Sequence, residues 1–215
     1  MQVHEIFQSI SGEVGAIPQG SIAWFIRFQG CSLACSWCDA PKAQNLNEGT
    51  VYSPQEILDK LPWYSTNVVL TGGEPYVQNP NELTELVFLL HQNGSRVQIE
   101  TNGKHIPYLD IPHIIDYKTP SSGMQDYMIG LRAYANLPRK SWIKFVIKDW
   151  EDAQFSLDKL IRLRPYIINK PIRIGFSTED GGLIETLIQE LNTMGEWFTN
   201  IVTFNMQIHK FLNLA

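Results

Sequence analysis

Short apolar, β-branched runs alternate with amphipathic segments along this chain, and this alternation constrains the fold more than any other feature. Strands joined by helical crossovers pair in parallel, because each crossover returns the chain to the same edge of the sheet. Strands are expected at residues 21–28, 67–71, 96–101, 113–117, 142–147, 172–176 and 201–207. Helices are expected at residues 53–60, 80–93, 124–134, 151–163 and 182–194. About six such units predict an α/β fold, a partial (β/α)6-type barrel, in a single domain over residues 1–215.

The composition excludes several classes of protein. The 215 residues are 44% hydrophobic and 18% charged, which is the profile of an ordinary globular domain rather than a disordered chain. Seventeen Lys and Arg against 22 Asp and Glu give a formal charge of −5, so no nucleic-acid partner is expected. No apolar stretch approaches the length of a membrane span, and the amino-terminal residues lack the pattern of a secretory signal. We therefore expect a soluble, cytoplasmic protein with no membrane partner.

All three cysteines lie close together, at Cys31, Cys35 and Cys38, directly after the first strand of the expected barrel. Loops at the carboxyl ends of parallel strands carry the chemistry of such folds. Three neighbouring thiolates predict a soft-metal site, either an iron–sulfur cluster or zinc. A closed zinc site needs a fourth ligand, and all five histidines lie well away in sequence. A cluster is therefore favoured, and three cysteines leave one iron of a cubane open. Thiols unrelated to metal are a third interpretation.

A second motif, Thr71-Gly72-Gly73-Glu74-Pro75, follows the next apolar strand. Glycines let a backbone approach a ligand closely, and Glu74 can accept a hydrogen bond from an ammonium group. Alone, the motif would fit a plain glycine turn. Together with the C-x3-C-x2-C spacing and Trp37 before the last cysteine, it resembles the signature of radical S-adenosylmethionine enzymes. The resemblance implies a [4Fe–4S] cluster on the three cysteines, with S-adenosylmethionine on the open iron. It also implies a partial barrel of the radical SAM kind, with the cluster loop after its first strand.

Several further segments resemble the 7-carboxy-7-deazaguanine synthase family of queuosine and 7-deazaguanine biosynthesis. The matching segments are residues 5–13, 25–31, 98–103, 118–124, 143–149 and 207–210. The resemblance covers nearly the whole chain. It implies a lyase that contracts the ring of 6-carboxy-5,6,7,8-tetrahydropterin to give 7-carboxy-7-deazaguanine, with loss of ammonia. It also implies a flavodoxin- or ferredoxin-type reductant and a homodimer.

The resemblance also assigns candidate site residues. S-adenosylmethionine is expected at Trp37, Cys38, Asp39, Gly72, Gly73, Glu74, Asp116, Tyr117, Lys118 and Ser177. The substrate is expected at Ile10, Ser11, Gly12, Glu13, Arg27, Thr71, His209 and Ala215. By residue type, Glu13 can read the amidine edge of a pterin, and Arg27 and His209 suit its carboxylate. The apolar chain end predicts that Ala215 packs back over the barrel mouth. A surface role for Arg27 and packing roles for His209 and the tail are the alternatives.

Two positions depart from the family pattern. The family follows its last cysteine with Asp-Thr, whose threonine helps hold Mg²⁺ against the substrate carboxylate. Here the pair is Asp39-Ala40, and alanine offers no side-chain oxygen. Ser11 stands where the family has glutamine, which shortens one polar contact. Three alternatives follow: the metal is missing, is bound by substrate and water alone, or is held by another residue. We therefore expect Mg²⁺ dependence to be weak or absent.

Two other functions stay open on the sequence. Another small radical enzyme, such as a glycyl-radical activase, would share the cysteine loop but would not predict the combination of Glu13, Arg27 and His209. A zinc-bearing interaction module would need a fourth ligand that the local sequence lacks.

Overall fold

The computed structural model describes residues 1–208 and 212 of the chain, and its centre is one nine-stranded sheet. The strands lie in the order β3-β1-β2-β4-β5-β6-β7-β8-β9. From β2 to β9 all neighbours are parallel, whereas β1 is antiparallel to both β2 and β3. Within the described residues, the outermost strands β3 (Thr50–Val51) and β9 (Val202–Asn205) do not pair with each other. The barrel is therefore open along one side, which confirms the predicted partial (β/α)6-type architecture.

The sequence pattern predicts the parallel strands well. They are β2 (Ile22–Phe28), β4 (Asn67–Gly72), β5 (Arg96–Thr101), β6 (His113–Asp116), β7 (Trp142–Val146), β8 (Arg173–Ser177) and β9. It does not predict β3 or β1 (Gln2–Ile10). β1 has few fully buried residues, and a half-exposed strand lacks the continuous apolar run of a central parallel strand. The cluster loop follows β2, the first parallel strand, as predicted.

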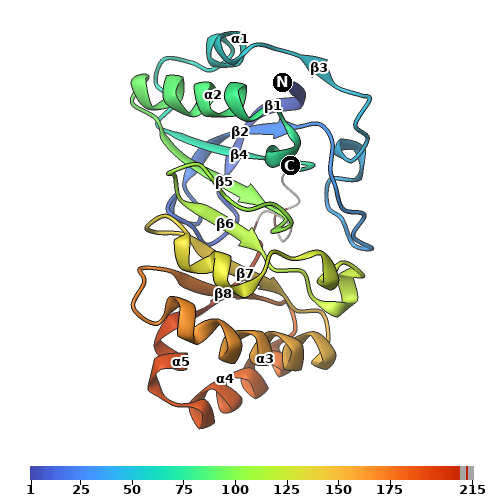
Figure 1. The fold of residues 1–215 in the computed structure, drawn as a ribbon, viewed down its shortest axis with the longest axis vertical. Helices are drawn as coiled ribbons and strands as arrows, with labels where there is room; N and C mark the ends of the chain where they lie inside the picture. Colours follow the sequence, from blue (N-terminus) through green and yellow to red (C-terminus); the bar gives the residue numbers. More distant parts are fainter. Residues whose placement is uncertain (209–211, 213–215) are drawn as a thin grey trace.

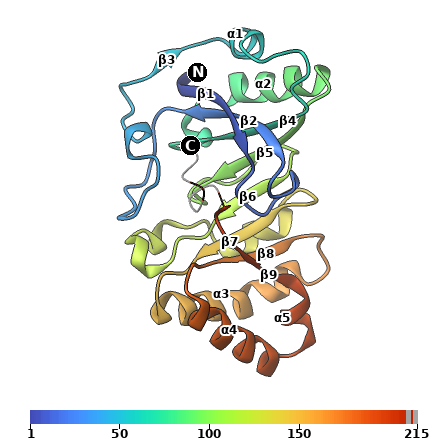
Figure 2. The same ribbon diagram turned by 180° about the vertical axis from the view of Figure 1, so that it is seen from behind.

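The α-helices cover the convex face of the sheet in two groups, at opposite ends of the long axis (Figures 1 and 2). α1 (Pro54–Asp59) and α2 (Pro80–Gln92) pack against β2, β4 and β5, and α1 begins at a capping box of Ser53 and Glu56. α3 (Trp150–Ile167), α4 (Gly181–Met194) and α5 (Glu196–Ile201) pack against β6, β7 and β8. None of the helices in the described chain is long and apolar enough to cross a membrane.

The predicted helix at residues 124–134 is wrong. The segment forms two 3-10 turns, Gln125–Tyr127 and Leu131–Asn136, with extended backbone at Met128 and Gly130 between them. The Ile129 N–H donates to the carbonyl of Gly103 at 3.0 Å. This bond fastens the segment to the loop after β5, and it replaces a bond along a helix axis. As a result, residues 102–112 and 117–141, all of which are described, connect their strands without an α-helix.

Alternation along the strands separates an apolar face from a polar one. On β5, Val97 and Ile99 pack under α2, whereas Gln98 and Glu100 face the concave side. The same period of two places polar or charged side chains inside the barrel near the carboxyl ends of all seven parallel strands. These residues are Arg27, Thr71, Glu100, Asp116, Lys144, Ser177 and Asn205. Charged side chains are almost never buried unless they are paired, and parallel barrels carry their active sites at the carboxyl ends of the strands, so this end of the barrel is the candidate site.

Candidate active site

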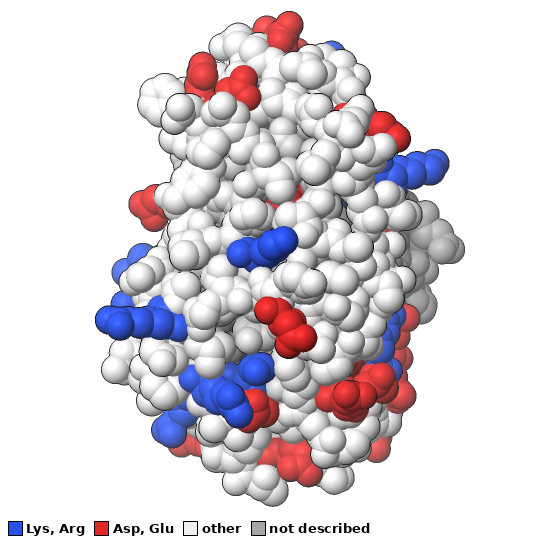
Figure 3. Space-filling model, turned by 45° about the vertical axis from the view of Figure 1, so that its right-hand side comes forward, with Lys and Arg blue, Asp and Glu red and all other residues white. Residues whose placement is uncertain are grey.

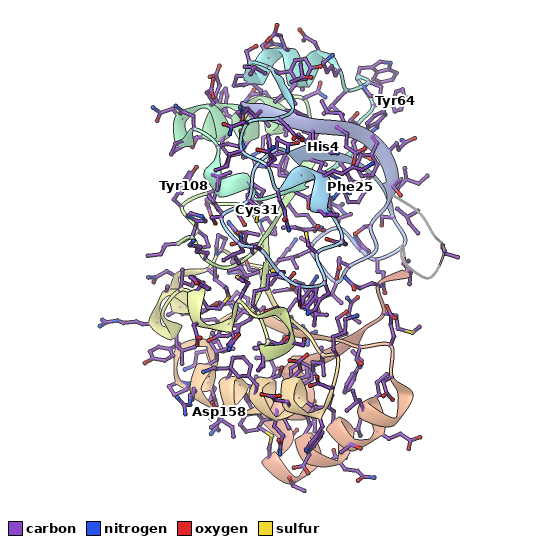
Figure 4. All side chains as sticks on the ribbon, turned by 90° about the vertical axis from the view of Figure 1, so that its right-hand side faces the viewer. His4, Phe25, Cys31, Tyr64, Tyr108 and Asp158 are labelled. Carbon is purple, nitrogen blue, oxygen red and sulfur yellow. The ribbon has the colours of Figure 1, made fainter. Side chains whose placement is uncertain are left out.

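Two adjoining cavities lie inside the barrel at the carboxyl ends of its strands. The larger, of about 450 Å³, is lined by β1, β2 and residues 39–43. The smaller, of about 120 Å³, lies beside the cysteines. The two share Glu13, Asp39, Thr71, Gly72 and Glu100. A molecule in the larger cavity therefore faces a group bound at the cysteines. Figure 4 labels Cys31 of the smaller cavity together with His4 and Phe25, which line the larger one.

The cysteine loop is held by backbone bonds and presents all three thiols to the smaller cavity. The N–H groups of Gly30 and Cys31 donate to the carbonyls of Ala43 and Gln44 at 2.7 and 3.1 Å. The thiols are partly buried, and burial raises the pKa of both Cys31 and Cys35. Two donors point at Cys31 Sγ, the Leu33 N–H at 3.4 Å and Asn102 Nδ2 at 3.5 Å. Donors of this kind stabilise ligating thiolates. Three partly buried thiols with such donors fit a cluster that has one open iron.

One histidine lies against this loop although it is remote in sequence. His105 Nε2 is 3.0 Å from Ser32 Oγ, and the Lys104 ammonium donates to the Ser32 carbonyl at 3.0 Å. His105 is thus bonded to a hydroxyl. Among the described residues, no three His, Cys, Asp or Glu side chains converge closely enough to hold a single metal ion. The zinc interpretation gains no support from this geometry.

Gly72 and Gly73 allow the end of β4 to pack tightly against the start of the cysteine loop. A Cβ on Gly73 would lie 2.1 Å from the Gly30 carbonyl oxygen and 2.4 Å from that of Ala43. Gly72 adopts φ +123°, and its Cβ would lie 2.3 Å from the Phe28 nitrogen. A side chain at Gly73 would therefore strike the backbone of the chain itself, whatever ligand is bound. These glycines position the loop through close backbone contact.

Glu74 is fully buried, and its carboxylate is engaged by the chain. It accepts hydrogen bonds from the N–H of Tyr76 at 3.0 Å, the Thr101 hydroxyl at 2.8 Å and the N–H of Asn102 at 2.7 Å. Burial raises its pKa, against the effect of these bonds. Glu74 thus ties the loops after β4 and β5 together. Its role toward a methionine ammonium stays a prediction: the three bonds leave one of the roughly four acceptor sites of the carboxylate for such a donor.

A buried ionic network crosses the barrel from the loop after β1 to β6 and β7. The Lys144 ammonium lies 3.0 Å from Glu13 Oε1 and 3.3 Å from Asp116 Oδ1, while Lys118 lies 2.8 Å from Asp116 Oδ2. Burial alone would raise the pKa of Asp116, but the two lysines outweigh it and hold the pKa at about 2. Glu13 also accepts from the amides of Asn205 at 2.8 Å and Gln207 at 2.5 Å. The network fixes Glu13 at the boundary between the two cavities.

Glu100 is a largely buried carboxylate of the site whose pKa is strongly raised. Burial and the neighbouring Glu13 carboxylate raise its pKa to about 7, with Lys144 opposing them. The Thr71 hydroxyl donates to Glu100 Oε2 at 3.0 Å. Since Glu100 lines both cavities, it is a group that can hold or release a proton near neutral pH where the two bound molecules would meet.

Arg27 brings a cation to the larger cavity. Its Nε lies 2.8 Å from Glu5 Oε1, and its guanidinium carbon lies 5.3 Å from the centre of the Phe7 ring. The Arg27 side chain is mostly buried, so the alternative interpretation of Arg27 as a surface residue is wrong. Phe7 itself stacks on Phe25, with ring centres 5.2 Å apart.

The structure brings together most, but not all, of the residues predicted from the sequence. Ile10, Gly12, Glu13, Arg27 and Thr71 line the larger cavity, and Asp39 and Ala40 lie on its wall. Trp37, Cys38, Gly72, Gly73, Asp116 and Lys118 line the smaller one. Ser11 is buried behind the wall, and its hydroxyl has no hydrogen-bond partner among the described residues. His209 and Ala215 lie outside the described residues.

Two predicted cofactor residues lie elsewhere. Tyr117 is buried under α3, where its ring stacks on Tyr134 and Phe145, because strand alternation sends it outward between Asp116 and Lys118. Ser177 lines a neighbouring cavity of about 320 Å³ at the end of β8, together with residues 178–180. The cofactor role of both residues stays a prediction.

Several site residues have no role in the sequence-based assignment. They are Lys42, Glu100, Asn102, Lys144, Asn205 and Gln207. For Lys144 a signal exists, since it is a charged residue between Ile143 and Phe145 in a central strand. Glu100 gives a weaker signal, as a charged residue that follows Ile99 near the end of another central strand. A charge at the carboxyl end of a parallel strand is typical of a functional residue.

The fold and the cysteine loop together define the class of protein. A family model described as the radical SAM superfamily matches residues 25–119, from β2 to just beyond β6. The crystal structure of QueE from Escherichia coli shares the fold with a TM-score of 0.71 at 23% identity, over 95% of this chain and 92% of that one. Radical SAM enzymes carry a [4Fe–4S] cluster and S-adenosylmethionine.

Relatives of known name narrow the class to one family. A protein of Clostridium acetobutylicum named 7-carboxy-7-deazaguanine synthase is 33% identical over 220 residues, covering 98% of this chain and 95% of the relative. A protein of the same name from Methanospirillum hungatei is 36% identical over 173 residues, covering 77% of this chain and 68% of the relative. The chain belongs to the 7-carboxy-7-deazaguanine synthase family of radical SAM enzymes.

Proposed function

We propose that this chain converts 6-carboxy-5,6,7,8-tetrahydropterin to 7-carboxy-7-deazaguanine, with loss of ammonia. The observation that carries the proposal is the larger cavity of about 450 Å³, which adjoins the cysteines. Its wall combines the rings of Phe7 and Phe25 with the charges of Arg27, Glu13 and Glu100. A flat, carboxylated heterocycle needs apolar surface for its ring and charged groups for its edges.

The cysteines and the residues around them fit the two cofactors of the family. A cluster on Cys31, Cys35 and Cys38, with S-adenosylmethionine bound to it, supplies the radical that starts the reaction. We place the S-adenosylmethionine site along residues 37–39, 72–74 and 116–118, with Ser177 at its far end. Lys118 supports this placement, because its ammonium lies 5.3 Å from the centre of the Trp37 ring and 2.8 Å from Asp116.

The chain's own contribution is to orient the substrate and to hold protons. Glu13, fixed by Lys144, Asn205 and Gln207, is preorganised to accept from the amidine edge of a pterin. With a pKa of about 7, Glu100 is protonated in about half of the molecules at neutral pH. Loss of ammonia requires a proton on the departing nitrogen, and Glu100 is the group in the cavity wall that can deliver it. Thr71 keeps the Glu100 carboxyl oriented toward the cavity.

The test is an anaerobic assay of cluster-reconstituted protein with S-adenosylmethionine, a chemical reductant and 6-carboxytetrahydropterin. We expect mass spectrometry to show that 7-carboxy-7-deazaguanine forms while the pterin is consumed. A protein with an intact cluster that cleaves S-adenosylmethionine yet leaves the pterin unchanged would contradict the proposal. The alternative of a glycyl-radical activase is favoured by no contact of the site.

We further propose a single-domain, cytoplasmic homodimer that takes electrons from a flavodoxin- or ferredoxin-type protein. The single sheet that runs through the described chain supports one domain. Acidic and basic side chains are interspersed on the face in Figure 3, which argues against a nucleic-acid partner there. Light scattering on the eluted protein checks the dimer, and reduction of the cluster by a purified flavodoxin checks the electron donor.

A further inference from the structure

The larger cavity does not offer the ligands that Mg²⁺ prefers. Mg²⁺ demands near-octahedral oxygen coordination, which proteins supply through carboxylates, waters and substrate oxygens. Ala40 brings a methyl group to the wall, and Glu5 and Glu13 are engaged with Arg27 and Lys144. Asp39 and Glu100 are the other carboxylates of the wall, yet no metal-binding group of three forms in the described chain. The residues present therefore do not fit a resident Mg²⁺.

Among the described residues, the lysine and arginine side chains that line this cavity are Arg27 and Lys42. The charge of Arg27 is balanced by Glu5, 2.8 Å away. Lys42 makes no ion pair with any residue that the structure describes. Among the residues that the structure describes, Lys42 is thus the cation of this cavity whose charge no ion pair balances. It lies two residues from Ala40, the position that lacks the hydroxyl.

The backbone at Lys42 is fixed, whereas its side chain is exposed. Pro41 begins a 3-10 turn, Pro41–Ala43, directly after Ala40. The Lys42 carbonyl accepts from Gln29 Nε2 at 3.0 Å, and the Ala43 carbonyl accepts from the Gly30 N–H at 2.7 Å. Gln29 is itself completely buried. The turn therefore fixes the Lys42 backbone at the cavity wall, and the flexible side chain can bring the ammonium to a ligand.

We propose that Lys42 binds the carboxylate of the substrate and takes the place of the divalent cation for which Ala40 provides no ligand. This inference rests on the proposed function, because the carboxylated ring is the anion that the ammonium would meet. A lysine ammonium is a compact point charge with three donors, which pairs with a carboxylate without demanding one fixed geometry. The cavity would then select carboxylated rings without any metal.

The test compares two ligands that differ in the carboxylate alone, 6-carboxytetrahydropterin and tetrahydropterin. Affinity is measured by anaerobic calorimetry on cluster-reconstituted protein with S-adenosylmethionine and a chelator. We expect Lys42→Met to weaken binding of the carboxylated ligand at least tenfold and to leave tetrahydropterin unchanged. Lys170→Met is the matched control, since Lys170 is an exposed lysine just before the amino end of β8, and it should alter neither affinity.

A second variant tests the exchange of roles. In Lys42→Met/Ala40→Thr, added Mg²⁺ should restore most of the lost affinity for the carboxylated ligand, whereas in the wild type Mg²⁺ should change nothing. Equal losses for both ligands, an unchanged affinity in Lys42→Met, or failure of Mg²⁺ to restore the double variant would overturn the inference. A wild type that neither binds nor converts the carboxylated pterin would instead contradict the proposed function, and with it the inference. Wild-type turnover with unaltered binding in Lys42→Met would contradict the role of Lys42 alone.

Discussion

Lys144 and Glu13 are 131 positions apart in the sequence, yet the Lys144 ammonium lies 3.0 Å from Glu13 Oε1 inside the barrel. The same ammonium reaches Asp116 on β6 at 3.3 Å. One buried cation thus bridges two carboxylates from distant parts of the chain. Because burial would lower the pKa of Lys144 and the carboxylates raise it above its ordinary value, the lysine stays charged. The bridge holds the loop after β1 against the centre of the sheet.

Removal of this cation should cost stability as well as activity. Lys144→Met leaves the buried Glu13 without a cation and Asp116 with Lys118 alone, and breaking a buried pair in this way costs about 3–5 kcal/mol. Urea unfolding should show the loss at pH 7. Lys144→Met/Glu13→Gln should recover part of it, since one of the unpaired charges is gone. A Lys144→Met protein within about 1 kcal/mol of wild type would mean that the carboxylates find other partners.

Glu100 should make stability fall as pH rises through neutrality. Its pKa is about 7 in the folded chain, against an ordinary value of 4.5, because burial disfavours the charged form. The folded state therefore binds this proton more tightly than the unfolded state does. Stability from this group is complete below pH 4.5 and is lost as pH rises from there through 7, at a total cost of about 3 kcal/mol.

Glu100→Gln should remove this pH dependence, because the amide keeps an acceptor for Thr71 but cannot ionise. Unfolding by urea at pH 5 and at pH 8 measures the difference in each protein. Glu85→Gln, at an exposed position of α2, is the control and should behave as the wild type does. An identical slope of stability against pH in Glu100→Gln and wild type would show that the carboxyl is not perturbed.

The sequence predicts those parts of the fold whose signals are local. A parallel strand buried on both faces needs an apolar β-branched run, and a cluster loop needs closely spaced thiols, so both can be read within ten or so residues. The failed helix at residues 124–134 depends instead on the Ile129–Gly103 bond, which no local pattern encodes. The strand β1 escapes prediction because its partner β2, and not its own composition, makes it a strand.

The candidate site divides in the same way. The cysteines, Arg27 and Thr71 were accessible from motifs, whereas the partners of Glu13 were not, since Asn205 lies 192 positions away. The position of Tyr117 follows from the alternation of side chains along an extended chain. Since Asp116 and Lys118 point into the barrel, the residue between them must point out of it. The sequence assigns the glycines of the second motif to a ligand contact, which stays a prediction, and it does not reveal their packing role. Their neighbours Gly30 and Ala43 become visible only in three dimensions.

The three cysteines should be required together. Cys35→Ala removes one thiolate, and a cluster held by two cysteines should not survive purification. We expect iron content and visible absorption to fall to background, and reductive cleavage of S-adenosylmethionine to 5′-deoxyadenosine to disappear. Ser36→Ala, which changes the next residue of the same loop, should keep its iron. A Cys35→Ala protein that made 5′-deoxyadenosine at the wild-type rate would contradict the three-cysteine assignment.

Gly73 should tolerate no side chain, even the smallest, for a reason that involves no ligand. The Cβ of Gly73→Ala would lie 2.1 Å from the Gly30 carbonyl oxygen and 2.4 Å from that of Ala43, and backbone atoms cannot turn aside as a flexible side chain would. Overpacking of this kind costs about 1–3 kcal/mol, and here the strain falls on the two residues that begin the cysteine loop and brace it. We therefore expect Gly73→Ala to lower both the stability of the apoprotein in urea and the iron retained after reconstitution. Gly130→Ala is the matched control, because its Cβ meets no atom within 4 Å. If Gly73→Ala kept the stability of the apoprotein and lost affinity for S-adenosylmethionine alone, the glycine would serve the ligand directly, and the packing argument would fail.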